Sequence, residues 1–489
     1  MTSLDLVVVG AYFAVTLGIG VWSSRRQATA GDYFLGARNL PAWAVLLSIV
    51  STETSALTVI SIPGIGARGD LTFLQLAIGY VVGRIGVAVW LLPGYFTGEQ
   101  ETAYARLESR FGIGTRRLLS VVFLVTRFLA DGVRIFAGAI PLALISGWSI
   151  PGAIVVMGLV TLVYTFFGGL KAVVWADVLQ LAVYIAGGVA ALVIGLELAG
   201  GPRVALAAAA AAGKLRLIDP TPSPTAPYTL IGGVIGGAML SAASHGTDHL
   251  IVQRLLATRS LGAARVALIG SGLVVFLQFL LFLAVGIAVW SAGLAPRDIP
   301  ADEIFTRFVL QYLPVGLVGL VIAGILAAAM SSSISALASS VTHDLYAGWT
   351  GRTDPTHLFR VGRAFSAGWG IGLILMALTF HYAAANKDTP LVVLALSIAS
   401  VTYGVLLGGY LLAGIKGPRG SDVIAAAAVT MPCMLIVMFA RALSSRESLA
   451  WLAPLGRLAW PWYVPLGTLL MVAIGILSSR IRRTQAAPA

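Results

Sequence analysis

The stretch Ser48-Ile-Val-Ser-Thr-Glu-Thr-Ser-Ala-Leu-Thr-Val-Ile-Ser-Ile-Pro-Gly64 is an apolar segment interrupted by polar side chains. Five of these, Ser51 to Ser55, are consecutive, and the segment ends at Pro63-Gly64. Hydroxyl and carboxyl groups are costly in a lipid-exposed helix, so the run predicts a membrane span that unwinds beside a polar cavity. The alternative is that small residues only let helices pack closely.

The composition of the whole chain places this stretch inside a membrane protein. Of the 489 residues, 58% are hydrophobic and 11% are charged, whereas an ordinary soluble protein has about 25% charged residues. The mean hydropathy is +0.92. These values exclude a soluble globular protein and a disordered chain. Because Cys433 is the only cysteine, an intramolecular disulfide framework is excluded as well.

Thirteen segments are long and apolar enough to cross a bilayer, which requires about 20 residues of helix. The segment 304–340 is too long for one straight span, so we expect it to break or tilt. The predicted fold is therefore an all-α polytopic membrane protein with about 13 helices. The predicted spans are 5–22, 42–64, 72–95, 118–146, 150–167, 177–199, 228–245, 262–291, 304–340, 359–380, 390–412, 422–440 and 459–478.

The basic residues predict the orientation of these spans. With the N-terminus outside and 5–22 read as an uncleaved first helix, the inner loops hold roughly twice as many Lys and Arg residues as the outer loops. This bias explains much of the formal net charge of +12 without a nucleic-acid partner. We therefore expect a multi-pass protein of the plasma (inner) membrane with a cytoplasmic C-terminus.

A second interrupted segment, 231–247, combines paired glycines with Ser241, Ser244, His245 and Thr247. It follows the first by five spans, as two inverted five-helix repeats would require. We predict one transporter domain, 1–489. Its predicted parts are an extra helix 5–22, repeats 42–199 and 228–412, and two peripheral helices within 422–478. For the glycines, close helix packing is the alternative.

Five motifs resemble those of the solute:sodium symporter family, over about residues 5 to 415. They are Tyr164–Gln180, with its Gly-Gly-Leu-Lys core and Asp177, and also Gly246–Arg254, Ala327–Ser333, Asp32–Arg38 and Thr102–Gly112. The related proteins include sodium/glucose and sodium/monocarboxylate cotransporters. The resemblance implies a leucine-transporter-like, 5+5 inverted-repeat fold and alternating access driven by sodium.

The resemblance also implies a first Na⁺ site. Its ligands would be the carbonyls of Ser51, Thr54 and Ala328 and the hydroxyls of Ser331 and Ser332. Residues 328, 331 and 332 share one helical face, and Na⁺ binds oxygen ligands of these kinds. The alternative is that the serines line a tight helix crossing.

A second Na⁺ site, present in some members, would use Asp177, Ser331 and Ser335. Ile334 stands where the family pattern has a hydroxyl. In the alternative interpretation, Asp177 pairs with a helix N-terminus or with an arginine near the inner surface.

Arg127, Asp131 and Arg134 lie on one face of the fourth span and leave one positive charge in excess. An arginine fork suits a carboxylate, and the resemblance implies that Arg134 meets the solute. The alternatives are a structural network of these three residues or pairing with Glu53. Glu53 could attract a cation, relay a proton or pair with an intramembrane arginine, whereas we interpret Arg84 as a packing or gate residue.

Five further residues are candidate solute contacts, although each could serve packing alone. The spans are poor in Asn, which weakens a sugar interpretation. The candidate contacts are Ser55, Thr58, Phe73, Gln75 and Tyr403.

The predicted function is sodium-coupled import of a small organic solute, with a carboxylate-bearing solute favoured. The expected partners are the anionic solute, Na⁺ and the lipid bilayer, with no obligatory protein partner. The alternatives are a carrier of a neutral sugar, polyol or amino acid, and a membrane sensor that acts through another protein. An enzyme is not expected, because clustered acid–base or metal-binding residues are not evident and a P-loop is missing.

Overall fold

The computed structural model describes residues 2–24, 29–54, 56–98, 100–329, 333–383 and 391–486. Within these ranges the chain is helical, without a β-strand. Three predicted site residues, Ser55, Ser331 and Ser332, lie outside the described residues.

The helices of the first half include the two that form the interrupted segment, α3 and α4. Between α5 and α6 the chain makes a π-helical turn, Val87–Leu91. The helices are α1 (Ser3–Ser24), α2 (Ala30–Leu35), α3 (Ala42–Glu53), α4 (Ala56–Arg68), α5 (Leu74–Gly86), α6 (Leu92–Tyr95), α7 (Ala105–Phe111), α8 (Ile113–Ser146) and α9 (Ile150–Leu198).

The second half begins with a short helix in the loop after α9, and its π-helical turn spans Val341–Tyr346. The helices are α10 (Pro202–Ala211), α11 (Leu230–Gly246), α12 (His249–Leu256), α13 (Leu261–Ser291), α14 (Ala301–Tyr312), α15 (Leu317–Ala329), α16 (Ser333–Ser340), α17 (Ala347–Thr350), α18 (Pro355–Ala383), α19 (Leu391–Ala413), α20 (Gly420–Leu443) and α21 (Tyr463–Ala486).

Helix α9 contains a sharp break at Gly169, where the backbone has φ 58° and ψ −171°. A residue with a Cβ atom is strained at such a φ, so the Gly-Gly pair of the Tyr164–Gln180 motif supplies the conformation that the bend requires. The break separates the two segments that the sequence predicts as the spans 150–167 and 177–199.

Seven helices of the described chain are long and apolar enough to cross a membrane, and the bent α3–α4 pair adds an eighth. The other predicted spans fall on helices such as α15, which has 13 residues, or α8, which carries Arg127, Asp131 and Arg134 in its middle. The multi-pass, all-helical architecture is confirmed. The count of thirteen spans stays a prediction.

Glycines of α11 and α5 let these two helices pack closely. A Cβ atom on Gly237 would lie 2.4 Å from the Leu76 carbonyl oxygen, and one on Gly79 would lie 2.5 Å from that of Val234. Such distances are too short for any side chain, so these glycines let the two backbones touch. The interruption in this region lies instead at Thr247 and Asp248, between α11 and α12.

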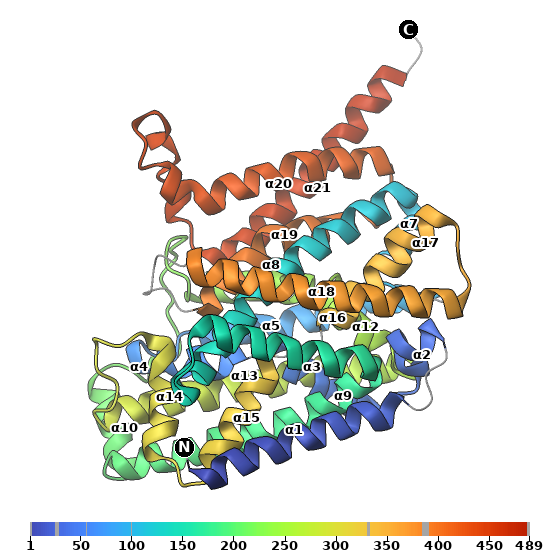
Figure 1. Ribbon diagram of the computed structural model, residues 1–489. Helices are drawn as coiled ribbons and strands as arrows, with labels where there is room; N and C mark the ends of the chain where they lie inside the picture. Colours follow the sequence, from blue (N-terminus) through green and yellow to red (C-terminus); the bar gives the residue numbers. More distant parts are fainter. Residues whose placement is uncertain are drawn as a thin grey trace.

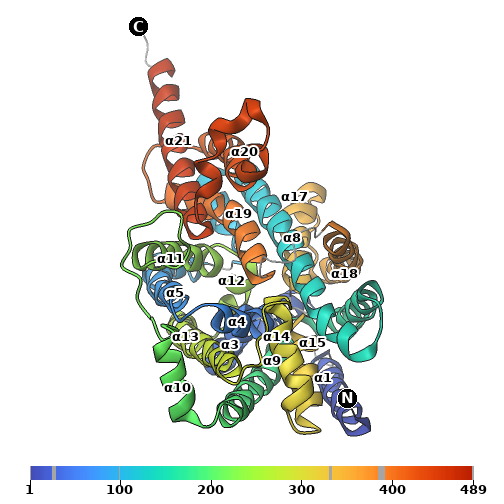
Figure 2. The same ribbon diagram turned by 90° about the vertical axis from the view of Figure 1, so that its left-hand side faces the viewer.

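The long helices run side by side, with α1 at one edge and α20 and α21 together at the opposite edge (Figures 1 and 2). Helices α4, α10 and α14 gather at one end of the bundle, which faces the viewer in Figure 2. Helix α4 packs against α13 and α14, and α19 packs against α8 and α21. The interrupted segment is thereby enclosed on several sides by other helices.

Candidate functional site

The interrupted segment bends by 60° between α3 and the part of α4 that begins at Thr58. Helix α3 ends at Glu53, and Thr54 has the non-helical angles φ −80° and ψ 65°. The Thr54 N–H still donates to the Val50 carbonyl at 2.7 Å, which completes the last turn. The break therefore falls within the polar run, whereas Pro63 lies inside α4.

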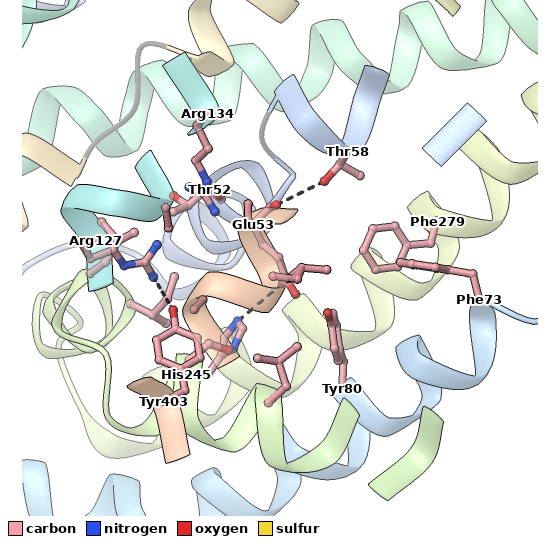
Figure 3. Close-up of a pocket in the computed structure, with 18 residues that line it drawn as sticks. Thr52, Glu53, Thr58, Phe73, Tyr80, Arg127, Arg134, His245, Phe279 and Tyr403 are labelled. Carbon is pink, nitrogen blue, oxygen red and sulfur yellow. Dashed lines mark hydrogen bonds and ion pairs between the residues drawn. The ribbon is translucent and has the colours of Figure 1, made fainter. Parts of the chain in front are cut away.

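A cavity lies beside this break and is lined by residues of α3, α4, α5, α8, α11, α12, α13 and α19 (Figure 3). One part of its wall is apolar and contains Phe73 and Phe279, whose rings pack edge to face at 5.2 Å. The other part is charged. The lining residues are Thr52, Glu53, Thr58, Phe73, Tyr80, Arg127, Ala130, Arg134, Leu240, Ser244, His245, Leu250, Ile251, Phe279, Ala395, Leu396, Ala399 and Tyr403.

Arg127 is fully engaged by Asp248 and Tyr403. Its Nε donates to Asp248 Oδ2 at 2.8 Å, and its NH2 lies 2.6 Å from the same oxygen. The Tyr403 hydroxyl donates to that oxygen at 2.7 Å and accepts from Arg127 NH2 at 3.1 Å. Asp248 Oδ1 also caps α12 by accepting from the Leu250 N–H at 2.9 Å. This ion pair therefore ties α8 to the α11–α12 break.

Glu53 forms a second ion pair, with Arg84. The Arg84 side chain is fully buried and its NH1 donates to Ser271 Oγ at 2.8 Å. Among the alternatives for Glu53, pairing with an intramembrane arginine is thus the arrangement in this structure, and the arginine is Arg84. Nε2 of His245 lies 3.5 Å from the same carboxylate.

Arg134 is held more loosely. Its NH1 lies 3.6 Å from Asp131 Oδ1 and donates to the Thr52 carbonyl at 3.3 Å. Asp131 is buried, and among the described residues neither of its oxygens has a hydrogen-bond partner. Arg127 NH1 is 4.0 Å from the same carboxylate. The three residues share one helical face as the sequence predicts, but Arg127 binds Asp248 much more closely than it approaches Asp131.

The charge balance differs from the sequence-based expectation of one excess positive charge on this face. Asp248 comes from a helix break far along the chain and neutralises Arg127. Arg84 and Glu53 add one charge of each sign. Because the three arginines and the three carboxylates in and around the cavity cancel formally, a bound cation would leave one positive charge for a solute anion to balance.

The predicted first Na⁺ site can be described only in part. Ser51 and Thr54 are buried at the end of α3, where Thr54 Oγ1 donates to Gln278 Oε1 at 2.7 Å. Ala328 is the last but one residue of α15, a helix that packs against α4. Ser331 and Ser332 lie outside the described residues, so the convergence of the five groups stays a prediction.

At the predicted second Na⁺ site, Asp177 is paired with Arg254. Arg254 NH2 lies 3.1 Å from Asp177 Oδ2, and Ser48 Oγ donates to that oxygen at 2.6 Å. Thr52 Oγ1 is 3.4 Å from it. Ser335 is buried, and its hydroxyl has no partner among the described residues. The alternative of an arginine partner for Asp177 therefore describes this structure.

The predicted solute contacts divide into two groups. Thr58, Phe73 and Tyr403 line the cavity together with Arg134. Gln75 does not: its amide donates to the Tyr228 carbonyl at 2.9 Å, and its Oε1 accepts from the Asp219 N–H at 3.2 Å, so it ties α5 to the loop before α11. Ser55 lies outside the described residues.

Several lining residues were not predicted as site residues, among them His245, Tyr80 and Phe279. His245 lies in the interrupted segment 231–247, which was a usable signal. Tyr80 and Phe279 belong to ordinary apolar helix faces, α5 and α13, so nothing in the sequence distinguishes them from packing residues.

Between α10 and α11, the loop closes over the end of α4. Lys214 Nζ donates to the carbonyls of Ala67 and Gly69, each at 2.8 Å, and lies 4.6 Å from the Trp290 ring centroid. Burial lowers the pKa of this ammonium group. The ammonium group thereby satisfies carbonyls at the C-terminus of α4.

Residues 33–414 match a family model described as the sodium:solute symporter family. The chain is 27% identical to a sodium/sialic acid symporter of Aliivibrio fischeri, over 98% of this chain and 93% of that protein. It is 28% identical to sodium-coupled monocarboxylate transporter 2 of Danio rerio, over 85% and 68%. It is 32% identical to the human sodium/iodide cotransporter, of which it spans only 42%.

A solved structure of a Na⁺-coupled sialic acid symporter, in a substrate-bound outward-open state, superimposes with a TM-score of 0.85. The alignment covers 98% of both chains at 24% identity. A nucleobase–cation symport family transporter in a closed conformation aligns with a TM-score of 0.56 at 14% identity. These likenesses confirm the all-helical, leucine-transporter-like fold that the family resemblance implies.

Proposed function

Because the chain belongs to the sodium:solute symporter family, we propose that it imports a small organic carboxylate together with Na⁺ across the plasma membrane. The N-terminus lies outside and the C-terminus in the cytoplasm, as the basic loops indicate. The relatives with carboxylated solutes, named for sialic acid and for monocarboxylates, support this solute class.

The observation that carries the proposal is that two of the three arginines have close carboxylate partners and the third does not. Arg84 is taken by Glu53 and Arg127 by Asp248, whereas Arg134 has only the Thr52 carbonyl and a distant Asp131. A guanidinium with spare donors at the wall of a cavity is suited to a carboxylate, which it can bind through two parallel hydrogen bonds. Arg134 is thus the proposed solute anchor.

Coupling to sodium follows from the placement of both proposed sites at one break. Ser51 and Thr54, the proposed Na⁺ ligands, flank Thr52 and Glu53, which line the solute cavity. Each ligand would therefore fix the same end of α3, and the one that binds first would lower the ordering cost for the other. Alternating access then proceeds only when both sites are filled.

Uptake into proteoliposomes tests the proposal. An inward Na⁺ gradient should drive accumulation of a short carboxylate such as propanoate, and replacing Na⁺ by K⁺ should abolish accumulation. If sugars or polyols accumulate and no carboxylate accumulates, the result would support the neutral-solute alternative instead. Carboxylate counterflow that is indifferent to sodium would contradict the coupling.

A further inference from the structure

Glu53 and His245, on α3 and α11, line the same cavity as the loosely held Arg134 (Figure 3). We propose that they form a second subsite, which binds a hydroxyl group of the solute, so that the preferred solute is a short hydroxycarboxylate. This inference rests on the proposed function, because it presumes that Arg134 holds the carboxylate.

Glu53 is suited to this role because Arg84 fixes its carboxylate and keeps it charged. The Arg84 side chain is fully buried behind Glu53 and cannot reach a solute. The Glu53 side chain is 16% exposed and lines the cavity. An immobile, charged acceptor is therefore presented to the solute, and a hydrogen bond to a charged group is stronger than one between neutral groups.

His245 brings an unused polar atom to the same place. The side chain is 97% buried, and Nε2 makes no hydrogen bond to any residue that the structure describes. Nδ1 lies 2.8 Å from Ser244 Oγ and 3.2 Å from the Ser241 carbonyl. The contact of 3.5 Å with Glu53 Oε2 is longer than a good hydrogen bond, so a ligand that bonds directly to Nε2 gains affinity.

The two groups together match a hydroxyl group. Because an ionised carboxylate only accepts hydrogen bonds, a neutral His245 suits Glu53 best with its proton on Nε2, and Nδ1 then accepts from Ser244 Oγ. Nε2 and Glu53 Oε2 are 3.5 Å apart. An oxygen atom placed beside the line that joins them, about 2.8 Å from each, can contact both at ordinary hydrogen-bond lengths. It would donate to Glu53 and accept from His245.

Other substituents fit less well. An alkyl group satisfies neither partner. An ammonium group can donate to Glu53 but cannot accept from Nε2–H, and it adds a positive charge where Arg84 already balances the carboxylate. Arg134 contacts the backbone carbonyl of Thr52, the residue next to Glu53, so both subsites lie at the same end of α3 and suit a hydroxyl near the carboxylate. Phe73 and Phe279 close the apolar side of the cavity. A 2- or 3-hydroxycarboxylate fits these conditions.

Thermal-shift titrations of the full-length detergent-purified protein in saturating Na⁺ test the subsite, because stabilisation follows ligand affinity. The ligands are propanoate, 2-hydroxypropanoate, 3-hydroxypropanoate and 2-aminopropanoate. At least one hydroxy acid should bind more tightly than propanoate, by about tenfold or more. The affinity for 2-aminopropanoate should not exceed the affinity for that hydroxy acid. Equal affinities for propanoate and both hydroxy acids, or a preference for the amino acid, would overturn the inference.

Two substitutions separate the role of Nε2 from the packing of the ring. His245→Asn places an amide near the position of Nδ1 and removes the distal nitrogen, whereas His245→Gln extends an amide toward the position of Nε2. The preference for the hydroxy acid should fall to within about threefold in His245→Asn and persist in His245→Gln. An unchanged preference in His245→Asn would overturn the proposal. Stabilisation by Na⁺ alone reports whether each variant is folded.

The same titrations distinguish this inference from the proposed function. If propanoate and the hydroxy acids bind with equal affinity and Arg134→Lys weakens the binding of all of them, the proposed function is supported and the hydroxyl subsite is contradicted. If no carboxylate stabilises the protein in Na⁺, both the proposed function and the hydroxyl subsite are contradicted.

Discussion

Arg127 approaches Asp248 to 2.6 Å at the wall of the cavity, although the two residues are 121 positions apart. The pair joins the middle of α8 to the first residue before α12, at the break between α11 and α12. Both side chains are almost completely buried. The ion pair therefore fixes the position of the α11–α12 break, and Arg127 is not available to bind a solute.

Breaking this pair from one side should destabilise the protein. Arg127→Met leaves the Asp248 carboxylate buried without its counter-charge, which costs about 3–5 kcal/mol. The double variant Arg127→Met with Asp248→Asn removes both charges and keeps a capping oxygen for α12, so it should recover most of the loss. The midpoint of thermal unfolding in detergent reports both effects. A single variant as stable as the parent would show that the pair is dispensable.

Arg134, by contrast, should affect solute binding more than stability. Replacing it by Gln removes charge-assisted hydrogen bonds to the proposed carboxylate, which corresponds to about tenfold to a hundredfold weaker binding. Arg134→Lys retains the charge but loses the fork, so its effect should be smaller. Stabilisation by Na⁺ alone should stay within about twofold of the parent. Unaltered carboxylate affinity in Arg134→Gln would remove Arg134 from the solute site.

Asp131 should oppose solute binding, because it lies 3.6 Å from Arg134 and competes for the guanidinium. In Asp131→Asn the carboxylate charge disappears while the side-chain shape is kept, so we expect carboxylate affinity to rise several-fold. Titration in saturating Na⁺ measures the change. A fall in affinity would instead mean that Asp131 orients Arg134 toward the solute.

The sequence predicted the all-helical, multi-pass architecture and the position of the first break because both depend on local patterns, whereas the leucine-transporter-like fold was implied by the family resemblance. Apolar segments of span length and the polar run 51–55 are visible without tertiary structure. The pairing of charges was not predictable. Asp248 reaches Arg127 only because two distant helices meet, and Glu53 had several possible partners until Arg84 was placed beside it. Likewise, Gln75 resembled a cavity residue by its position in a span, yet it binds loop backbone.

Asp177 bears on the number of Na⁺ ions in each cycle. Its Oδ2 already accepts from Ser48 Oγ at 2.6 Å and lies 3.1 Å from Arg254 NH2, a fixed positive charge. A second cation beside this arginine would be repelled. We therefore expect one Na⁺ per solute, which makes co-transport of a monoanion electroneutral. Simultaneous measurement of flux and current tests this. A net inward positive charge for each monocarboxylate would indicate a second Na⁺.

Thr54 offers a test of the first Na⁺ site, through the bond from its Oγ1 to Gln278 Oε1 at 2.7 Å. Both side chains are buried, and Gln278 Nε2 has no partner within the described chain. Thr54→Val keeps the shape but leaves Gln278 without its donor, at a cost of about 1–3 kcal/mol. Since the Thr54 carbonyl is a proposed Na⁺ ligand, loss of this anchor should weaken Na⁺ binding several-fold, whereas Thr54→Ser should preserve it.

Thermal-shift titration with NaCl against KCl, in the absence of solute, measures the affinity for Na⁺ in both Thr54 variants. Loss of stability in Thr54→Val without any change in Na⁺ affinity would make the Thr54–Gln278 bond a packing contact between α3 and α13. The ion would then have to be held by groups that do not depend on where α3 ends. Weakened Na⁺ binding in Thr54→Val alone supports a site built on the break itself, since Thr54→Ser keeps the hydroxyl that donates to Gln278 and Thr54→Val removes it.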